Sequence, residues 1–269
     1  MTPKNNDLLV RREDGVLVLT FNRPEHRNAL TMEMQQRLGD ELAAAELDRE
    51  IGCVVLTGAG GAFCAGGDVK SMANNHKTGA PVDHLWRMEM QRQAQRRSSL
   101  RLYEMAKPTL AALPGAAAGA GLSMALACDM RIAADTAVMT TAFVKVGLSG
   151  DYGGTYLLTQ LVGPAKAREL YLLGDRIDMT EAARLGLVNW VVPAAELEKK
   201  AMDIAKRLAS GPRLAQRYIK DNLNRAQKMS FADCLDMESA NLMQLRETED
   251  HKEAAKAFAE KRAPKFTGR

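Results

Sequence analysis

The sequence predicts an α/β protein, with an α/β core over residues 1–194 and a helical region over residues 195–269. Short β-branched or apolar segments end at glycine or proline, as strands do. Glycine-rich turns and helical patterns separate these segments, which gives a repeating strand–helix–strand scheme. After residue 195 only helical periodicity remains. A chain of 269 residues is long enough to bury a full core.

The first predicted elements are two strands with a helix between them. Residues 15–24 and 51–58 are predicted strands because both are β-branched or apolar and end at proline or glycine. The intervening helix has apolar residues every four positions and charged residues on its other face, and Thr31 can cap its start. Those apolar positions are Leu30, Met34, Leu38 and Leu42.

The middle of the chain continues this alternation. Residues 108–114 and 130–134 are predicted strands, and an alanine- and glycine-rich helix begins between them near Gly119. Residues 83–105 are polar and rich in methionine and arginine, which predicts a long surface helix. A mobile loop over residues 74–81 is expected before it.

The last part of the chain carries two amphipathic helical faces and no strand pattern. The first face consists of Leu197, Ala201, Ile204 and Leu208, and the second of Phe231, Leu235, Leu242 and Leu245. We therefore expect helices to close the chain.

Composition excludes several classes of protein. With 46% hydrophobic and 26% charged residues, the chain is typical of a soluble globular protein. No apolar run approaches the roughly 20 residues of a membrane span, and the first residues lack the apolar segment of a secretory signal. The net charge of +4 includes no basic tract, so nucleic acid is not an expected partner. We therefore expect a cytoplasmic protein that contacts no membrane.

Cysteine and histidine spacing indicates neither a disulfide framework nor a metal site. The cysteines lie far apart without a CxxC pair, and they are predicted to be small core residues. They are Cys53, Cys64, Cys128 and Cys234. The four histidines show no metal-ligand spacing, so no metal is expected.

Two runs rich in glycine and alanine, 58–70 and 113–129, are the most informative feature of the chain. Each follows a short β-branched or apolar segment, and small residues let a main chain approach a ligand closely. Neither run contains the Gly-Lys-Ser/Thr of a Walker loop or the third glycine of a dinucleotide fingerprint. Backbone N–H groups near a helix start can bind an anion, so the runs predict two backbone cradles for an oxyanion.

These runs belong to a wider resemblance. The chain resembles the crotonase superfamily, the enoyl-CoA hydratase/isomerase family, in the segments NRPEHRNAL (22–30), AFCAGGDVK (62–70), GAAAGAGLSMALACD (115–129) and AFAEKRAPKFTGR (257–269). The resemblance implies a β-β-α superhelical core and a helical C-terminal region for oligomerisation and pocket closure. It implies a homotrimer or a dimer of trimers. It also implies an acyl-CoA substrate, whose coenzyme A is part of the substrate, and no separate cofactor.

The resemblance assigns roles to residues of both runs. Gly67 and Ala120 match the positions whose backbone N–H groups hold the thioester oxygen and would stabilise an enolate. Ala65 matches the position whose carbonyl receives the adenine amino group, and Asp68 is expected to cap the following helix. The residues expected to contact the acyl-CoA are Arg27, Ala65, Gly66, Asp68, Gly119, Phe143, Phe258 and Lys261.

Arg27, Phe258 and Lys261 have a simpler interpretation as solvated surface side chains. Phe258 and Lys261 match positions that help to cover the adenine and phosphates of coenzyme A, sometimes across a subunit interface. Arg27 could approach a phosphate. The resemblance alone therefore carries their proposed contacts.

The acid–base residues depart from the hydratase pattern of this family. Typical hydratases carry two glutamates that hold and activate water, and this chain has Ser123 and Phe143 at those positions. Neither side chain can act as a carboxylate base, so hydration by the usual mechanism is not expected. A carboxylate occurs instead at Asp151, within GLSGDYGGTYLLTQLVG (147–163), ahead of a helix predicted to start near Gly153.

The surroundings of Asp151 resemble two branches of the family. The pattern Gly-Leu, two residues, Asp, one residue, Gly-Gly-Thr matches the isomerase branch of the phenylacetate pathway, which converts a ring epoxide to an oxepin and moves double bonds. Asp151 also matches the nucleophile of 4-chlorobenzoyl-CoA dehalogenases. However, the partner histidine and the indole of that branch fall at Arg96 and Phe143. The isomerase branch is therefore favoured.

The expected function is an enoyl-CoA isomerisation through a thioester enolate. One carboxylate suffices because the same base can take a proton from one carbon and return it to another. An apolar pocket would raise the pKa of a catalytic Asp151. Hydration is an alternative that needs a second group, such as Glu89 or a water on Asp151. A non-catalytic acyl-CoA-binding subunit is another, motivated by the loss of both glutamates.

Overall fold

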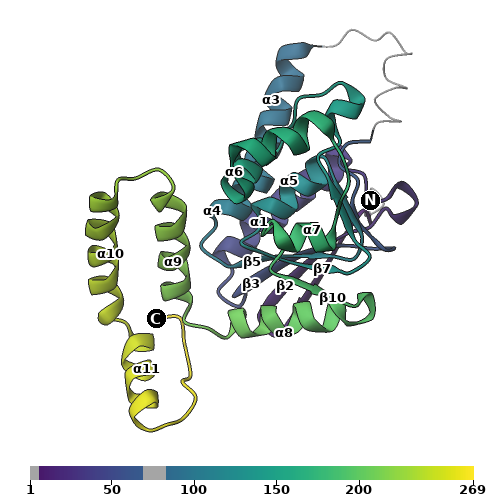
Figure 1. Cartoon of the computed structure of the whole chain (residues 1–269). Helices are drawn as coiled ribbons and strands as arrows, with labels where there is room; N and C mark the ends of the chain where they lie inside the picture. The colour runs from purple at the N-terminus through teal and green to yellow at the C-terminus, as the bar shows by residue number, and fades with distance from the viewer. Residues whose placement is uncertain (1–5, 69–82) are drawn as a thin grey trace.

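The computed structural model describes residues 6–68 and 83–269, which form two β-sheets surrounded by helices (Figure 1). The larger sheet consists, in spatial order, of β1 (Leu8–Glu13), β2 (Val16–Phe21), β3 (Cys53–Gly58), β5 (Thr109–Leu113), β7 (Met130–Ala134) and β10 (Trp190–Val192). β1 pairs antiparallel with β2, and the other neighbours pair in parallel. The central strands are buried, as parallel strands covered on both faces are.

The smaller sheet consists, in spatial order, of β4 (Ala62–Cys64), β6 (Ala116–Ala118), β8 (Val138–Thr140) and β9 (Ile177–Asp178). β4, β6 and β8 pair in parallel, and β9 joins antiparallel. Each of the successive pairs β3–β4, β5–β6 and β7–β8 gives one strand to each sheet, and a helix is the next described element. The β-β-α core implied by the family resemblance is therefore confirmed.

Helices cover both faces of the larger sheet. In Figure 1, α8 (Leu197–Ala209) lies below this sheet, whereas α1 (Met32–Leu47) and α5 (Ala120–Ala127) lie above it. The remaining α-helices are α3 (His84–Gln95), α4 (Arg101–Glu104), α6 (Gly154–Leu173), α7 (Met179–Arg184), α9 (Arg213–Ala226), α10 (Phe231–Arg246) and α11 (Glu249–Ala259).

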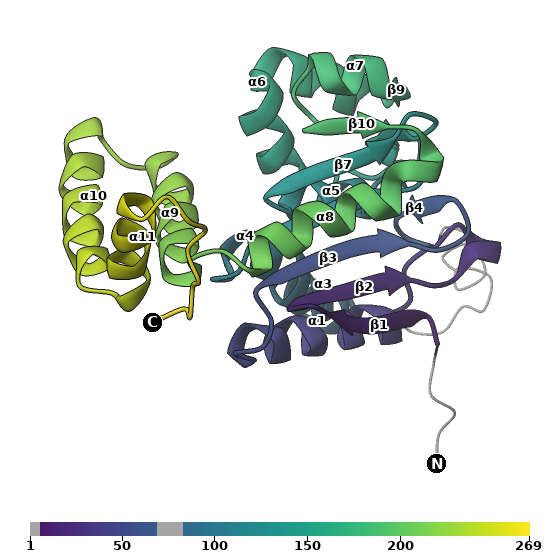
Figure 2. The ribbon, with the colours of Figure 1, turned by 90° about the horizontal axis from the view of Figure 1, so that it is seen from below.

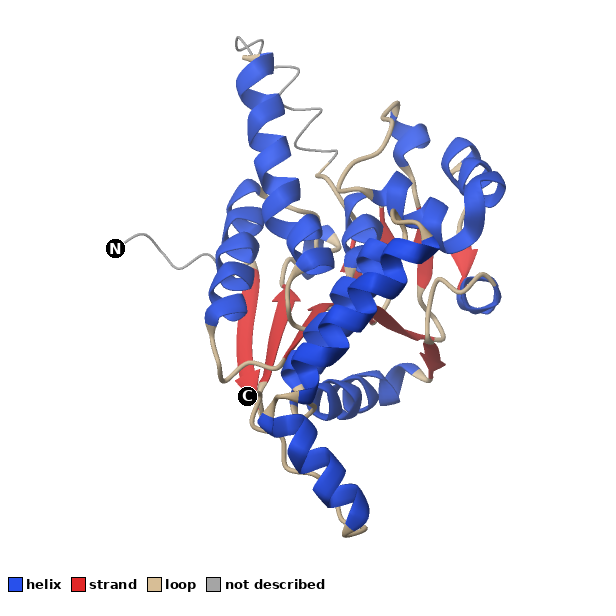
Figure 3. Ribbon diagram, turned by 90° about the vertical axis from the view of Figure 1, so that its left-hand side faces the viewer, coloured by secondary structure: helices blue, strands red, loops and turns tan. Residues whose placement is uncertain are grey.

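The helices α9, α10 and α11 stand away from the α/β core (Figures 1 and 2). Figure 3 shows α3, which follows the grey segment, and α11 projecting at opposite ends of the molecule. Although the chain is helical beyond residue 195, α8 packs against β3, β5 and β7. The predicted domain boundary at 194/195 stays a prediction, but the helices that leave the core begin at α9.

Several local predictions are confirmed to within one or two residues. The Thr31 hydroxyl accepts a hydrogen bond from the Met34 amide at 3.1 Å and so caps α1. The apolar face of this helix, including Leu38 and Leu42, is buried. The helices predicted near Gly119 and Gly153 begin one residue after these glycines, which adopt positive φ.

The long helix predicted over residues 83–105 is present but is not uniform. It consists of α3, a π-helical turn over Arg96–Leu100, and α4. In this stretch the Ser98 and Ser99 hydroxyls donate to the carbonyls of Ala94 and Gln95, at 2.6 and 3.1 Å. The loop predicted over 74–81 lies outside the described residues.

Two further points concern the exposed surface. Phe231 and Leu235, expected on one face of the last helices, are exposed on α10 at 80% and 50%.

None of the described helices combines the length and the apolar character needed to cross a membrane. A cytoplasmic location stays a prediction.

Candidate active site

The two glycine-rich runs meet where β4 and β6 end. Gly66 has φ of +85°, and a Cβ atom placed on it would lie 2.8 Å from the Ala118 carbonyl oxygen and 3.1 Å from the Ala120 nitrogen. A Cβ atom on Gly121 would lie 2.3 Å from the carbonyl oxygen of Cys64. Only glycine fits at either position, because a side chain would displace the neighbouring main chain.

Two backbone N–H groups at this junction are the predicted oxyanion donors. Ala120 is the first residue of α5, where helix N–H groups have no intrahelical acceptor. Gly67 follows the Gly66 carbonyl, which accepts a hydrogen bond from the Leu30 amide at 2.8 Å and fixes the loop. In the described part of the chain neither the Gly67 nor the Ala120 amide donates a hydrogen bond. Both are therefore available to a ligand oxygen.

Gly67, Ala120 and Asp151 line one cavity of about 570 Å³, although they are far apart in the sequence. The structure thus brings the predicted donors and the predicted base to the same space. The rest of the cavity is formed mainly by α1 and by α3 with the π-helical turn. Its other lining residues are Leu30, Thr31, Met32, Glu33, Gln35, Gln36, Asp68, Trp86, Arg87, Met90, Gln91, Gln93, Ala94, Arg97 and Tyr152.

Asp151 lies in the turn before α6, where its carbonyl accepts a hydrogen bond from the Gly154 amide at 3.1 Å. Its carboxylate Oδ2 accepts a bond from Gln91 Nε2 at 3.3 Å. Oδ1 is buried and has no hydrogen-bond partner among the described residues. Burial raises the pKa of Asp151 to about 6 from its usual value of 3.8. A carboxyl group with such a pKa can both accept and return a proton near neutral pH.

Ser123 and Phe143, which stand where hydratases carry glutamates, are packed away from this cavity. Ser123 is 1% exposed and its hydroxyl donates to the Gly119 carbonyl at 3.2 Å. A Cβ atom on Gly154 would lie 2.3 Å from Ser123 Oγ, so a side chain at position 154 would collide with Ser123. Phe143 stacks on Tyr171 with ring centroids 6.0 Å apart. Neither residue is among those lining the cavity, so the predicted contact of Phe143 with the substrate stays a prediction.

Asp68 lines the cavity and lies 3.7 Å from the Arg23 guanidinium. The helix that it was expected to cap falls outside the described residues. Arg23 also donates to the Ala29 carbonyl at 2.7 Å, so it ties the two loops together. No pattern in the sequence around Arg23 indicates this role.

The residues expected to contact coenzyme A fall into two groups. Arg27 and Ala65 are neighbours, because the Ala65 amide donates to the Arg27 carbonyl at 2.9 Å. Phe258, which is 88% exposed, lies on α11, and Lys261 follows that helix. Neither of them lines the cavity within this chain. Their contacts with a substrate stay predictions.

Gln91 is a site residue that was not predicted from the sequence. It lies one helical turn before Gln95 on α3, and that i, i+4 spacing is the only local signal. The α3 residues Trp86 and Met90 also line the cavity, and the polar, methionine-rich pattern of this helix did not predict that. Glu89, named for the hydration alternative, pairs with Arg92 at 2.9 Å and is not among the lining residues.

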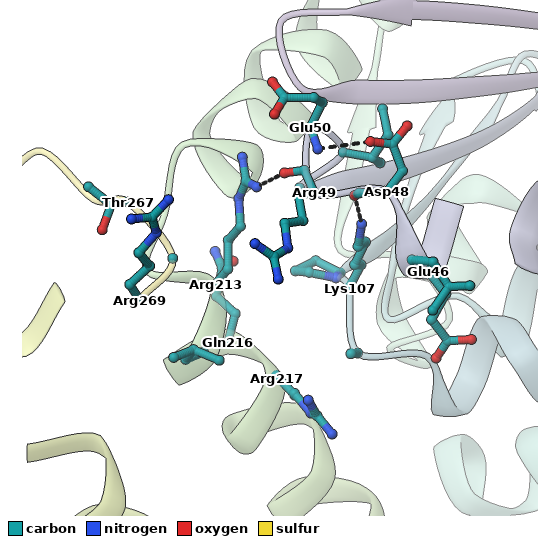
Figure 4. A pocket seen from close by; sticks show the side chains of 17 residues that line it. Glu46, Asp48, Arg49, Glu50, Lys107, Arg213, Gln216, Arg217, Thr267 and Arg269 are labelled. Atoms are coloured by element: carbon teal, nitrogen blue, oxygen red, sulfur yellow. Dashed lines mark hydrogen bonds between the residues drawn. The ribbon is translucent and has the colours of Figure 1, made fainter. Parts of the chain in front are cut away.

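A larger cavity, of about 830 Å³, lies between the end of α1, the start of α9 and the last residues of the chain (Figure 4). Figure 4 shows Arg213 donating to the Arg49 carbonyl, and Glu50 donating its amide to Asp48. These bonds join the ends of neighbouring elements. The cavity contains none of the predicted site residues, so volume alone does not locate the active site.

No group of three His, Cys, Asp or Glu side chains in residues 6–68 and 83–269 is placed to hold a metal ion. The groups that the candidate site offers are the Gly67 and Ala120 amides and the half-buried carboxylate of Asp151.

Comparison with known proteins gives a consistent result. The sequence model of a family described as enoyl-CoA hydratase/isomerase matches residues 11–269. The chain is 37% identical over 262 residues to a 1,2-epoxyphenylacetyl-CoA isomerase of Escherichia coli (strain K12), covering 97% of this chain and 98% of that protein. It is 34% identical over 263 residues to a short-chain-enoyl-CoA hydratase of Clostridium acetobutylicum, covering 96% of each.

Solved structures are similar throughout the chain. A crystal structure of an enoyl-CoA hydratase from Polaromonas sp. JS666 aligns with a TM-score of 0.88 at 35% identity, covering 97% of this chain and 99% of that one. A Bacillus anthracis enoyl-CoA hydratase aligns with a TM-score of 0.89 at 32% identity, covering 98% of this chain and 100% of that one.

Proposed function

Because the chain belongs to the enoyl-CoA hydratase/isomerase family, we propose that it shifts a double bond in an acyl-CoA, or opens a ring, by proton transfer through Asp151. One observation carries this proposal. The cavity that holds the Gly67 and Ala120 amides, which donate to none of the described residues, is also lined by the half-buried carboxylate of Asp151. An acyl-CoA thioester is the substrate that suits two amide donors beside a base.

The proposed mechanism uses the amides and the carboxylate in sequence. The thioester oxygen sits between the N–H groups of Gly67 and Ala120, and Asp151 removes a proton from the carbon next to the thioester carbonyl. Negative charge then develops on the oxygen, where each amide stabilises the enolate by roughly 3 kcal/mol. Asp151 returns the proton to a carbon two bonds away. No water is consumed, so one carboxylate completes the reaction.

Hydration is the second candidate, favoured by the similarity to the Clostridium acetobutylicum hydratase. It needs a second group to activate water, and Glu33 and Asp68 are the other carboxylates among the lining residues. Asp68 already pairs with the Arg23 guanidinium at 3.7 Å, which gives it a structural partner. The two positions where hydratases carry glutamates hold Ser123 and Phe143, which are buried and have no carboxylate to activate water.

The test incubates purified protein separately with a 3-enoyl-CoA and with the matching trans-2-enoyl-CoA. Conjugation gained from the 3-enoyl substrate without added mass supports the isomerase. Conjugation lost with the mass of one water supports the hydratase. Asp151→Asn should abolish turnover and leave binding of an acyl-CoA nearly unchanged. Asp175→Asn, at an exposed carboxylate, is the matched control.

A binding protein without catalysis would retain affinity for the acyl-CoA but turn over neither substrate. We propose that coenzyme A enters only as part of the substrate, with no separate cofactor. We also propose a homotrimer or a dimer of trimers, which the exposed apolar residues of α10, such as Phe231, support. Light scattering coupled to size exclusion measures that state.

A further inference from the structure

The turn that carries Asp151 has an unusual backbone. Tyr152 adopts φ of +51°, between Gly150 at +123° and Gly153 at +75°. A bulky aromatic residue rarely occupies the left-handed region, and such conformations persist only where surrounding contacts hold them. Tyr152 is nevertheless buried, at 2% exposure. The contacts around Tyr152 therefore determine where the neighbouring carboxylate lies.

Three glutamine side chains from two helices reach this dipeptide. Gln91 Nε2 donates to Asp151 Oδ2 at 3.3 Å. Gln95 Oε1 accepts from the Tyr152 amide at 2.9 Å. Gln35 Oε1, on α1, accepts from the Tyr152 hydroxyl at 2.6 Å. The contacts thus include the carboxylate, the next amide and the next side chain.

We infer that Gln35, Gln91 and Gln95 form a glutamine clamp that holds the Asp151–Tyr152 turn and sets the position of the carboxylate for proton transfer. The inference rests on the proposed function of Asp151. Gln91 is the member that touches the carboxylate. Gln35 and Gln95 are positioning residues, because they act through Tyr152.

The members of the clamp act differently on Asp151. Gln91 donates a hydrogen bond to the ionised carboxylate, and this favours ionisation and opposes the effect of burial. Gln95 and Gln35 accept from Tyr152, so they fix geometry without contacting the charge. Loss of Gln91 should therefore change the titration of Asp151, whereas loss of Gln95 should change the rate.

The glutamine variants leave the other ionisable side chains near Asp151 in place, so these side chains are the same in every protein compared. Burial raises the pKa values of Cys64 and Tyr171 to about 12, so both stay neutral at working pH. The Tyr152 pKa is raised further by burial and by Asp151. The charged residues on the cavity wall are Glu33 on α1, Asp68 after β4, Arg87 on α3 and Arg97 in the π-helical turn.

The first arm of the experiment titrates the protein labelled with [¹³C]aspartate by NMR, with Asp151→Asn used to assign the Asp151 signal. The wild-type midpoint should lie at about 6. In Gln91→Met the midpoint should rise above the wild-type value, because a donor to the charged form is lost. Gln160→Met, at an exposed glutamine on α6, should leave the midpoint unchanged.

The second arm measures kcat, KM and the pH dependence of kcat/KM. Gln95→Met and Gln35→Met should lower kcat by roughly 10- to 100-fold at nearly constant KM, since a misplaced base costs rate more than binding. The acidic limb should stay in place for both. In Gln91→Met the limb should move upward together with the NMR midpoint.

The two arms separate failure of the clamp from failure of the proposed function. Equal midpoints in wild type and Gln91→Met, or an unchanged kcat in both Gln95→Met and Gln35→Met, would overturn the clamp. Turnover that survives in Asp151→Asn would overturn the proposed function while the NMR titration still decides the role of Gln91. Thermal unfolding of each variant identifies any loss of folding.

Discussion

Gly66 and Ala118 come so close together that a methyl group on Gly66 would lie 2.8 Å from the Ala118 carbonyl oxygen. This contact joins the chain after β4 to the last residue of β6, one residue before the proposed donor Gly67 and two residues before the proposed donor Ala120. The distance between those donors therefore depends on an absent side chain. A binding site for one oxygen atom tolerates little change in such a distance.

Substitution Gly66→Ala should lower kcat/KM by about 100-fold or more, because displacing one donor of an oxyanion site has an effect of that size. Gly61→Ala is the matched control. Gly61 also has positive φ, at +75°, but a Cβ atom there meets nothing within 4 Å. Both variants force alanine into a positive φ, but only the Gly66 variant places a Cβ atom against neighbouring main-chain atoms. Steady-state kinetics and thermal unfolding of both variants measure the difference, and equal losses in the two would contradict the prediction.

Asp151→Asn should stabilise the protein above about pH 6. The folded-state pKa of about 6 exceeds the usual 3.8, so the folded state binds the proton more tightly than the unfolded state. The free energy of unfolding therefore falls as pH rises from about 4 to about 6, and above that range the full destabilisation by ionised Asp151 is present. It amounts to on the order of 1–3 kcal/mol. Urea unfolding at pH 4 and pH 8 checks the sign, and a less stable variant at pH 8 would refute it.

Lys220→Met should weaken the attachment of α9 to the core. The Lys220 ammonium is buried and donates to the carbonyls of Leu102 and Lys107 and to Asp129 Oδ2, at 2.9, 3.2 and 3.0 Å. Removing one partner of a buried ion pair is costly, and partial exposure of Asp129 reduces this to about 2–4 kcal/mol.

Chemical denaturation followed by circular dichroism measures the loss. Arg184→Met, which breaks an exposed pair with Glu181 on α7, should leave the stability nearly unchanged, because water screens exposed ion pairs. If both variants lose the same amount, Lys220 is not an anchor of α9.

Only Cys234 should react rapidly with a thiol reagent in the folded protein. Burial raises the pKa values of Cys64 and Cys128 to about 12 and that of Cys53 further, so these thiols remain protonated and inaccessible. Cys234 on α10 is partly exposed. Titration with Ellman's reagent should give one fast thiol in buffer and four in denaturant, and rapid labelling of a second folded-state thiol would count against this packing.

Residues that serve a local need were predictable from the sequence. Thr31 caps a helix through its own hydroxyl, and Gly119 provides a positive φ where α5 begins. The resemblance pointed to Asp151, which lines the same cavity as the two proposed donors. Its chemical role remains a proposal.

Features that depend on distant contacts were not predictable. β4 and β6 contain three residues each, mostly alanine and cysteine, which is too short for a period-two pattern. β1 was missed because half of its positions face solvent, so it reads as polar. Gln91 and Asp151 are 60 positions apart, and nothing near either residue indicates that they meet.

The π-helical turn over Arg96–Leu100 has a consequence for how this wall of the site can change. An inserted residue within a helix rotates everything before it relative to everything after it. Gln91 and Gln95 precede the turn, whereas the anchoring contacts of Leu102 follow it. Deleting one residue from the turn would rotate both glutamines off Asp151 while leaving the hydrophobic anchor in register. Small insertions and deletions there offer an evolutionary route to a different catalytic environment without rebuilding the fold.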